Sequence, residues 1–307
     1  METIDYHGHT LRRWTLGPST FLARPEAGAR LMHWGLRMPD GSFRDVLHWP
    51  DDADFAQFAK VRGGNPILFP FCDRLTHNGR AGYWKTPAGE VRPMPQHGFA
   101  RDGAFEIEAA DANGFRARLV PDDRSAEAYP FDYAFTVAYT FAELSLRAEL
   151  RLTNRGSAPL PWSAGHHFYF ALPWHRELLR KHYRYQIPAK KCFRHGPDGD
   201  LQPVKPVPAE GAFSEDGGGA LIFSRLRDGL TRFGPNGGEE DIGVRILDEG
   251  GTYSTWNAFT LWTEAAESPF YCVEPWMGPP NAPAHKKGLH TVAPGESAAF
   301  TVDVALL

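Results

Sequence analysis

The sequence has few cysteines, no long apolar run and almost no charge imbalance. Its 3 cysteines in 307 residues are an odd number with wide spacing, which fits neither a disulfide framework nor a zinc motif, so we expect reduced thiols. No stretch approaches the length of a membrane span, and the first residues lack the features of a signal peptide. The net charge of -4 offers no positive field for nucleic acid or an anionic membrane. We therefore expect a cytoplasmic protein without nucleic-acid or membrane partners.

Long amphipathic helices are also scarce, whereas alternation of apolar and polar residues is frequent. In residues 131–139 the large apolar side chains occupy odd positions, and from Leu144 to Leu152 they occupy even positions. The parity changes near Ala142 and Glu143, which predicts an antiparallel hairpin because parallel strands need a long crossover. Similar alternation occurs at 105–107, 115–119 and 298–306. The 31 glycines and 26 prolines suit many short strands and turns, so we predict an all-β chain.

Three other segments bear on the organisation of the chain. Apolar spacing predicts short helices over residues 52–61 and 174–181. The segment 197–219 is rich in glycine and proline and is interpreted as a long surface excursion. Because strand patterns continue on both sides of it without a compositional break, we expect a single domain over residues 1–307.

Four segments concentrate histidine, glutamate, arginine and aromatic residues beside structure-breaking residues, at 62–74, 96–101, 165–170 and 273–276. A histidine inside an aromatic run is more often a hydrogen-bonded, half-buried residue than a catalyst, and most glutamates are solvated. Glu274, however, follows an apolar stretch and precedes Pro-Trp, so a buried carboxylate there would need a polar partner. A sugar hydroxyl is one such partner.

Taken together, these segments and their order resemble the aldose 1-epimerase (galactose mutarotase) family, including its hexose-6-phosphate epimerase branch. The matching landmarks run through nearly the whole chain: Gly-Asn-Pro-Ile-Leu-Phe-Pro at 64–70, His-Gly-Phe-Ala-Arg at 97–101, Tyr-Pro-Phe at 129–131, Asn154 with Gly156, Pro161 and Ser163, His167 with Tyr169-Phe170, Glu-Pro-Trp at 274–276 with Gly278, Gly-Leu at 288–289, and Pro-Gly-Glu-Ser at 294–297. The resemblance implies a large antiparallel β-sandwich, the galactose mutarotase-like supersandwich, with an open groove lined by these segments.

The resemblance also implies catalytic roles. Exchange of the anomers of an aldohexose needs a base for the C1 hydroxyl proton and an acid for the ring oxygen. By matched position Glu274 is the base, His167 the acid and His97 a second donor. Neighbours in a strand face opposite sides, so only one of His166 and His167 faces the groove, and we assign His167.

Substrate-binding roles follow in the same way. Arg74 would hold sugar hydroxyls through its fork of donors, and Asp228 is a candidate substrate-binding carboxylate. Apart from the resemblance, stacking on a pyranose face is open to five tryptophans, several of which are expected in the core: Trp84, Trp162, Trp256, Trp262 and Trp276. The surroundings of Arg62 and Arg101 resemble the hexose-6-phosphate branch, and guanidinium groups bind phosphate oxygens in a bidentate way. An arginine beside a glycine loop also often bonds carbonyls or carboxylates, so a structural role for these two arginines stays open.

The sequence therefore predicts an isomerase, an aldose 1-epimerase of unspecified hexose, with glucose-6-phosphate 1-epimerase as an alternative. A non-catalytic carbohydrate-binding protein is a second class, because sandwiches with aromatic grooves also bind sugars without reacting. A polysaccharide lyase or glycoside hydrolase is a third, although a hydrolase usually wants two carboxylates at the scissile bond. The expected partner is a small sugar. We expect no cofactor or metal, because the chemistry is proton transfer and the sequence contains no ligand cluster with metal spacing.

Overall fold

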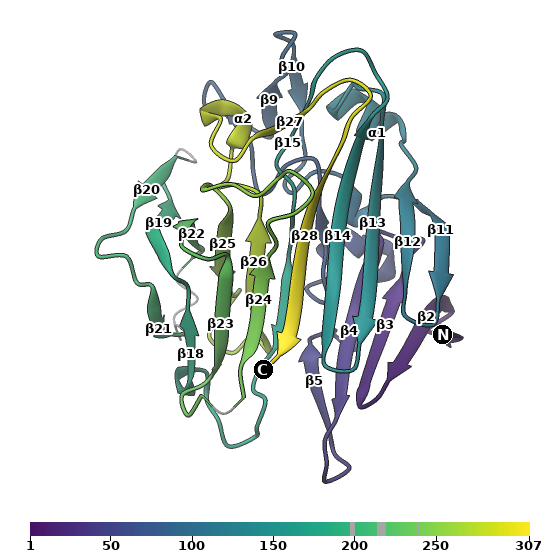
Figure 1. Cartoon of the computed structure of the whole chain (residues 1–307), viewed down its shortest axis with the longest axis vertical. Coiled ribbons are helices and arrows are strands. Elements are labelled where there is room, and N and C mark those ends of the chain that lie inside the picture. The colour runs from purple at the N-terminus through teal and green to yellow at the C-terminus, as the bar shows by residue number, and fades with distance from the viewer. Residues whose placement is uncertain (197–199, 214–218, 239) are drawn as a thin grey trace.

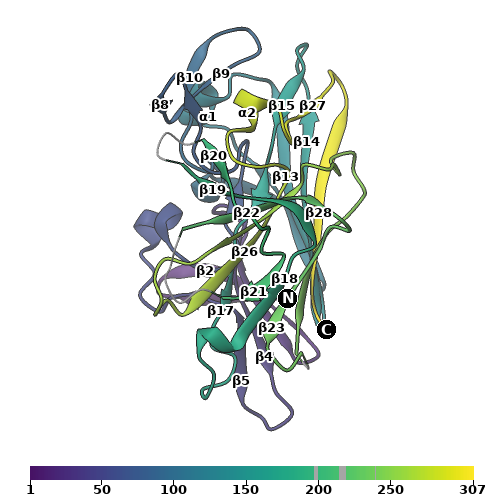
Figure 2. The same cartoon turned by 90° about the vertical axis from the view of Figure 1, so that its left-hand side faces the viewer.

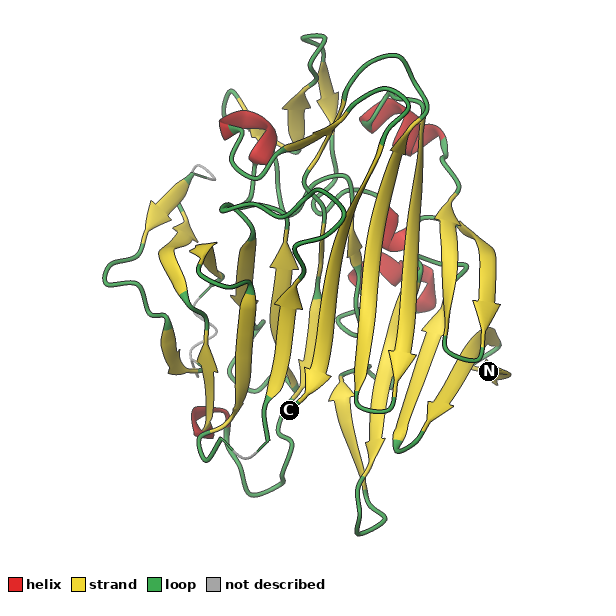
Figure 3. Cartoon of the chain, in the orientation of Figure 1, coloured by secondary structure: helices red, strands yellow, loops and turns green. Residues whose placement is uncertain are grey.

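Two large antiparallel sheets pack face to face (Figure 1 and Figure 2). The computed structural model describes residues 1–196, 200–213, 219–238 and 240–307. Strands make up most of the regular structure and the helices are short, as Figure 3 shows in yellow and red. The predicted all-β fold, a large antiparallel β-sandwich with few short helices, is confirmed.

The larger sheet has 13 strands within the described residues. Its hydrogen-bonded path runs, in spatial order, through β1 (Glu2–Tyr6), β2 (His9–Leu16), β3 (Ser19–Arg24), β4 (Arg30–Arg37), β5 (Phe43–Leu47), β17 (Phe168–Ala171), β26 (Phe270–Trp276), β25 (Ala258–Trp262), β22 (Leu221–Leu226), β19 (Ala189–His195) and β20 (Leu201–Pro203). The short strand β16 (Gly165–His166) joins the sheet by pairing with both β26 and β6 (Ile67–Leu68).

The smaller sheet has nine strands within the same described ranges. Its order is β11 (Phe105–Asp111), β12 (Gly114–Leu119), β13 (Tyr133–Ala142), β14 (Ser145–Asn154), β28 (Ser297–Leu306), β24 (Ile242–Ile246), β23 (Leu230–Pro235), β18 (Tyr183–Gln186) and β21 (Glu210–Ala212). The predicted hairpin is β13–β14: Ala142 pairs with Ser145, so Glu143 and Leu144 form the turn where the parity of the sequence changes. The alternating strand at 298–306 is β28, which pairs with β14.

The remaining elements are short. Three two-stranded pairs are β7 (Thr76–His77) with β8 (Arg80–Ala81), β9 (Tyr83–Lys85) with β10 (Val91–Pro93), and β15 (Leu160–Trp162) with β27 (His290–Val292). The helices are α1 (Asp123–Ala128), α2 (Ala282–His285) and the 3-10 turns η1 (Phe55–Lys60), η2 (Ala100–Asp102) and η3 (Arg180–His182). Among the described residues, no helix is long and apolar enough to cross a bilayer.

Aromatic side chains from both sheets form the core between them. Phe21 on β3 stacks on Phe141 of β13 with ring centroids 4.4 Å apart, and Phe170 on β17 meets Phe233 of β23 edge-on at 4.7 Å. Burying one such side chain stabilises the fold by about 1.5–3 kcal/mol. Phe168 and Phe170 both face this core, so by strand alternation Tyr169 points to the opposite face of the larger sheet. The core thereby fixes the orientation of β17.

The two predicted helices have different outcomes. Residues 52–61 contain η1, a 3-10 helix that is shorter than expected and begins after Asp54, whose side chain accepts a hydrogen bond from the backbone N–H of Ala56. The helix predicted over 174–181 is wrong, because this segment consists of bends and a turn, with a 3-10 turn only from Arg180 onward. Its polar groups are bonded elsewhere: the N–H of Trp174 donates to the hydroxyl of Tyr183 at 2.6 Å.

The segment 197–219 is more than a surface loop. Residues 197–199 and 214–218 lie outside the described residues. Of the rest, β20 pairs with β19 in the larger sheet and β21 pairs with β18 in the smaller one. These parts lie at the surface as expected, since most of their residues are exposed or half-buried, but each also supplies an edge strand that the sequence did not indicate.

Candidate active site

A cavity of about 470 Å³ lies over the face of the larger sheet that points away from the core. Its floor comes from β17, β25 and β26, and its walls come from β19 and from the segments around residues 60, 73 and 97. The lining residues are Ala59, Lys60, Arg62, Pro66, Leu68, Asp73, Gln96, His97, Arg101, His167, Tyr169, His195, Ala220, Thr260, Trp262, Glu274 and Trp276.

His167 and Glu274 form the centre of the cavity floor. The pairs Gly165–Trp276 and Phe168–Val273 share one register, which places His167 directly opposite Glu274 on neighbouring strands. Opposite residues of an antiparallel pair have adjacent side chains. The Nε2 atom of His167 lies 3.4 Å from Oε2 of Glu274. Gly165 allows the two neighbouring segments to lie this close, because a Cβ at this position would lie only 2.6 Å from Cδ1 of Trp276, its partner on β26.

His166 points the other way. It is fully buried in the core, where its Nδ1 lies 2.9 Å from Nδ2 of Asn65 and its ring stacks near Phe300. The same Asn65 accepts a hydrogen bond from the backbone N–H of His167 through Oδ1 at 2.9 Å. The side-chain amide of Asn65 thus holds both the ring of His166 and the backbone of His167. The two side chains point to opposite faces of the sheet, and only that of His167 lines the cavity.

The carboxyl group of Glu274 is almost completely removed from solvent, with 2% of its surface exposed. Burial, followed by the negative charge of Asp73, raises the pKa of Glu274 well above its ordinary value. Burial likewise lowers the pKa of the His167 imidazole, with the positive charges near it adding to this effect. Taken separately, the shift at Glu274 favours the neutral carboxyl group and the shift at His167 favours the neutral imidazole. A buried group with a perturbed pKa in a cleft is a candidate for acid–base chemistry.

Several polar atoms on the cavity floor have no hydrogen-bond partner among the described residues. They are Oε2 of Glu274, Nδ1 of His167 and Oγ1 of Thr260, and all three are buried. Thr260 stands opposite Glu274 on β25. A buried polar group without a partner costs free energy, so this concentration indicates a floor that a hydroxylated ligand would complete.

His97 is held over the floor by an unusual turn. His97 and Asp73 both have left-handed backbone conformations, with φ of 65° and 59°. They bond each other twice: the N–H of His97 donates to the Asp73 carbonyl at 2.9 Å, and the N–H of Asp73 donates to Nδ1 of His97 at 3.1 Å. Left-handed non-glycine residues are strained and cluster at functional sites. Gly98 completes the turn, because a Cβ there would lie 1.8 Å from the Phe69 carbonyl oxygen.

This turn also determines the protonation of His97. Because Nδ1 accepts a hydrogen bond, a neutral His97 carries its proton on Nε2. Burial lowers the pKa of His97 to about 4, although the charge of Asp73 opposes this. The ring lies 5.4 Å from the ring of His167, edge to face. His97 is thus a neutral hydrogen-bond donor beside His167 at neutral pH.

Asp73 also binds His195, the third histidine that lines the cavity. Its Oδ2 lies 2.6 Å from Nε2 of His195, and its Oδ1 accepts from Nε2 of Gln96 at 3.0 Å. Burial would raise the pKa of Asp73, but the hydrogen bond from His195 and the nearby imidazoles lower it to about 2. Asp73 is therefore ionised, and the pKa of His195 is raised by the same hydrogen bond.

Three basic side chains also line the cavity. Arg62 places its guanidinium 5.1 Å from the ring centroid of Trp262 and forms an ion pair with Glu264 at 2.7 Å. Arg101 and Lys60 line the same cavity. Burial lowers the pKa of Arg101. The cavity lining therefore combines basic side chains with the buried carboxyl group of Glu274.

The structure brings together six of the eight residues that the sequence nominated. Glu274, His167, His97, Arg62, Arg101 and Trp276 all line the cavity. Arg74 is exposed just beyond the turn at Asp73 and is not among the lining residues. Asp228 is also exposed and outside the lining, and its Oδ1 accepts from the N–H of Leu230 at 3.2 Å.

Sequence reasoning missed several residues of the site. Asp73 is adjacent to Arg74, and the sequence offered no sign of which of the two faces inward. His195 lies on a strand far from the other motifs. Thr260 was also missed. It stands two residues before Trp262 on β25 and so shares the cavity face of that strand, which alternation alone could have indicated once β25 was paired with Glu274.

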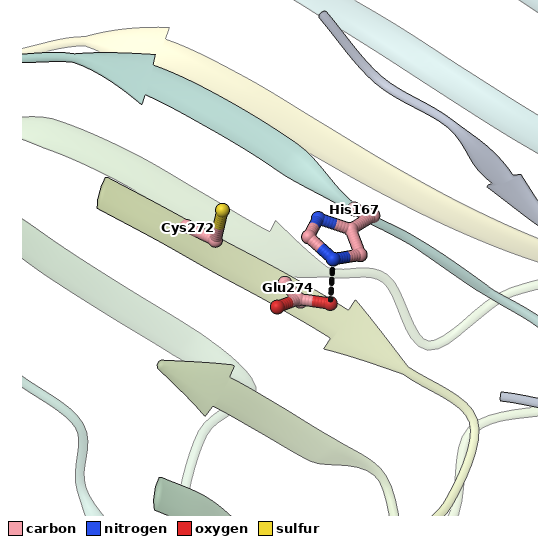
Figure 4. A group of neighbouring side chains, drawn as sticks. All are labelled: His167, Cys272 and Glu274. Atoms are coloured by element: carbon pink, nitrogen blue, oxygen red, sulfur yellow. Dashed lines mark ion pairs between the residues drawn. The ribbon is translucent and has the colours of Figure 1, made fainter. Parts of the chain in front are cut away.

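One side-chain cluster has the composition of a metal site. Potential ligand atoms of His167, Cys272 and Glu274 all lie within 4.8 Å of one another, and all three residues are buried (Figure 4). Cys272 is not bonded to another cysteine, and the other two thiols, Cys72 and Cys192, are free as well. Sequence spacing did not reveal this cluster, because His167 is remote in sequence from the other two residues.

Chemically, the arrangement can move protons at two ends of a small ligand. A carboxyl group and an imidazole 3.4 Å apart, with a second imidazole donor beside them, can take a proton from one ligand atom and return one to another. The unpartnered floor atoms and the two arginines can orient hydroxyl or phosphate groups.

Comparison with known proteins gives a concordant result. The sequence model of the family described as aldose 1-epimerase matches residues 16–214. A search of curated proteins finds no match to the chain. Among solved structures, a protein of Synechocystis sp. PCC 6803 is similar at 24% identity and a TM-score of 0.78, covering 100% of this chain and 99% of that one.

Two further structures share the fold. A galactose mutarotase related enzyme from Lactobacillus acidophilus is 18% identical, covers 97% of each chain and has a TM-score of 0.77. A galactose mutarotase-like protein from Lactobacillus casei ATCC 334 is 20% identical, covers 97% of this chain and 100% of that one, and also has a TM-score of 0.77. At these identities the likeness shows the fold.

Proposed function

Since this chain belongs to the aldose 1-epimerase family, we propose that it is a mutarotase, which interconverts the α and β anomers of an aldohexose in the cavity around Glu274 and His167. The observation that carries this proposal is the pair itself: a buried carboxyl group and an imidazole, 3.4 Å apart, at the floor of a cavity large enough for one sugar ring.

The proposed reaction moves two protons and breaks one ring bond. The carboxylate of Glu274 takes the proton of the C1 hydroxyl, while protonated His167 gives its proton to the ring oxygen. The bond from C1 to the ring oxygen breaks, and C1 becomes an aldehyde carbon. Rotation about the C1–C2 bond presents the other face of the aldehyde. Ring closure reverses both proton transfers and restores the two side chains.

The pKa directions are compatible with this cycle. Burial disfavours an isolated carboxylate and an isolated imidazolium alike, but the two charges 3.4 Å apart compensate each other. Transfer of one proton from the Glu274 carboxyl group to the His167 imidazole therefore gives the reactive form, a carboxylate beside an imidazolium, without proton exchange with solvent. His97, with its proton on Nε2, would donate a hydrogen bond near the ring oxygen and stabilise charge there.

A binding protein without catalysis is the competing class. Trp262 and Trp276 line the cavity and would serve a lectin as well as an enzyme. A lectin, however, has no need of a buried carboxyl group beside an imidazole, and such a pair costs stability when no ligand is bound. The pair therefore favours the enzyme.

Exchange NMR at anomeric equilibrium tests the proposal. With catalytic amounts of protein, cross-peaks between the H1 signals of the α and β anomers should appear for at least one of glucose, galactose and glucose 6-phosphate. Line broadening from binding, without exchange between the anomers of any of these sugars, would instead support the carbohydrate-binding alternative.

A phosphorylated hexose is the second candidate substrate. The observation that favours it is the position of Arg62, Arg101 and Lys60, all lining the cavity that holds the acid–base pair. Arginine matches the geometry of phosphate oxygens through parallel hydrogen bonds. In this version of the proposal the chain is a glucose-6-phosphate 1-epimerase with the same proton chemistry.

Substitution of the two arginines separates the candidates. If the substrate is glucose 6-phosphate, Arg62→Ala and Arg101→Ala should each lower kcat/KM for that sugar by about 10- to 100-fold, because a hydrogen bond to a charged group contributes about 1.5–3 kcal/mol. Free glucose should change only slightly. Arg155→Ala, an exposed arginine outside the cavity, is the control. Equal effects on both sugars would rule out the phosphate assignment.

The pH dependence should respond to Asp73. Its negative charge raises the pKa of Glu274 and opposes the lowering at His97, so it strengthens proton binding in the cavity. Asp73→Asn removes that charge, and the pH range in which the pair holds its single proton should move to lower pH. Profiles of kcat/KM against pH for wild type, Asp73→Asn and the remote control Asp303→Asn would show this. An unmoved profile, or one displaced to higher pH, would contradict the electrostatic account.

A further inference from the structure

The cluster of His167, Cys272 and Glu274 contains a thiol that the proposed proton chemistry does not use. Cys272 and Glu274 are two residues apart on β26 and therefore project from the same face of that strand. His167 projects beside them from the neighbouring chain segment, so the three side chains converge, as Figure 4 shows. Cys272 packs against Tyr169, Phe270 and Trp262 and is fully buried.

We propose that this cluster binds a zinc-class cation, with one nitrogen of His167, the sulfur of Cys272 and a carboxylate oxygen of Glu274 as ligands. Zinc binds nitrogen and oxygen at about 2.0–2.2 Å and sulfur at about 2.3 Å, and a tetrahedron with these lengths separates its ligand atoms by about 3.3–3.7 Å. The His167 Nε2 to Glu274 Oε2 distance is 3.4 Å. All three ligand atoms lie within 4.8 Å, so closure around a cation needs movements of about 1 Å.

The ligand set selects the kind of metal. Imidazole, thiolate and carboxylate together suit zinc and its neighbours among the transition metals, whereas magnesium and calcium require mostly oxygen ligands. A second observation points to a ligand here: Oε2 of Glu274 is buried and has no hydrogen-bond partner among the described residues, and its ion-pair neighbour at 3.4 Å is another proposed ligand, His167. Three protein ligands leave a fourth position, and the cavity lined by His167 and Glu274 supplies access to it.

Binding would exchange protons for the metal. Thiolate and carboxylate are the binding forms, so the proton of the Cys272 thiol, and that of Glu274 when it is protonated, leave to solvent as the cation enters. The metal then occupies the electron pairs of Glu274 and His167 that would otherwise bind the transferred protons. Resting on the proposed function, this part of the inference makes the cation an inhibitor of anomer exchange that competes with the sugar.

Cobalt(II) tests the site without relying on activity, because a cobalt–thiolate bond gives a charge-transfer absorption in the near ultraviolet. Cobalt(II) added to the purified full chain should produce this band, and zinc should displace it. Cys272→Ala and Cys272→Ser should each lack the band. Cys192→Ala, which removes another buried thiol on β19, should keep it. Two replacements of Cys272 are used so that one folded variant is available, as judged by circular dichroism.

Inhibition is the second readout. Zinc should inhibit wild type and Cys192→Ala, with recovery after a chelator, and the inhibition constant should rise at least about 10- to 100-fold in the Cys272 variants, since losing even an outer partner of a metal ligand has that effect. If the cobalt–thiolate band persists in the Cys272 variants, or if wild type shows no such band, the proposed metal site is ruled out. If the band behaves as expected but no sugar exchanges, the proposed function fails and the metal site stands.

Discussion

Glu274→Gln should lower kcat/KM for anomer exchange by about 10²- to 10⁴-fold, because glutamine keeps the size and polarity of the side chain but cannot accept the C1 hydroxyl proton. Each tenfold loss corresponds to about 1.4 kcal/mol of transition-state stabilisation. The variant should remain folded, since it replaces a 2% exposed carboxyl group that has an unpartnered oxygen with a neutral amide. Rates are measured by polarimetry and folding by thermal unfolding.

Glu240→Gln is the matched control for this variant. Glu240 is a surface carboxylate that pairs with Arg44 and His175 away from the cavity, so its replacement should leave the rate within a few-fold of wild type. If Glu274→Gln were as active as Glu240→Gln, the base would have to be another group, and the assignment of Glu274 would be wrong.

The second large effect is a contrast between adjacent histidines. His167→Ala should lower kcat/KM by about 10²- to 10⁴-fold through loss of the proton donor, with a modest change in stability because the side chain borders the cavity. His166→Ala should instead lower stability strongly and change kcat/KM only modestly. Its ring is fully buried beside Phe168 and Phe300, so removing it leaves a core void and should cost about 2–4 kcal/mol of unfolding free energy.

The contrast is measured on the two purified variants by urea unfolding and by initial rates well below the unfolding transition. A His166→Ala protein that is stable but inactive would show that the strand orientation does not separate the two roles. The same conclusion would follow if His167→Ala retained full activity.

Strand alternation accounts for what the sequence predicted well. The parity of apolar residues placed the β13–β14 turn within one residue, at Glu143 and Leu144. The same rule separated His166 from His167, since adjacent residues of a strand face opposite sides. These are local properties, because the side-chain period of a strand depends only on its own backbone.

Residues positioned by long-range contacts could not be found in this way. The sequence favoured Arg74, but a left-handed turn at Asp73 sends the carboxylate to the cavity and leaves the arginine exposed. His195 reaches the site because β19 lies two strands beyond β25 in the sheet, which no local pattern encodes. Cys272 differs from these residues: it stands two positions before Glu274, so strand alternation alone gives the two side chains a shared face once β26 is known.

The helix expected over 174–181 shows a related limit. Its apolar spacing is compatible with a helix, yet Arg180 donates to the carbonyl oxygens of Ala265 and Ser268 at 2.9 and 2.5 Å. The segment thus makes its polar contacts with another loop rather than along a helix. Tertiary contacts outweigh helix propensity in short segments, since an isolated helix of this length is marginal.

Polarimetry of freshly dissolved α anomers is the most direct test of the proposed mutarotase activity. The optical rotation of α-D-glucose, α-D-galactose or glucose 6-phosphate should relax to equilibrium faster than the spontaneous rate for at least one sugar. The added rate should be proportional to the concentration of wild-type protein and should largely vanish in Glu274→Gln and His167→Ala. Relaxation at the spontaneous rate for all three sugars, at every wild-type concentration, would contradict it.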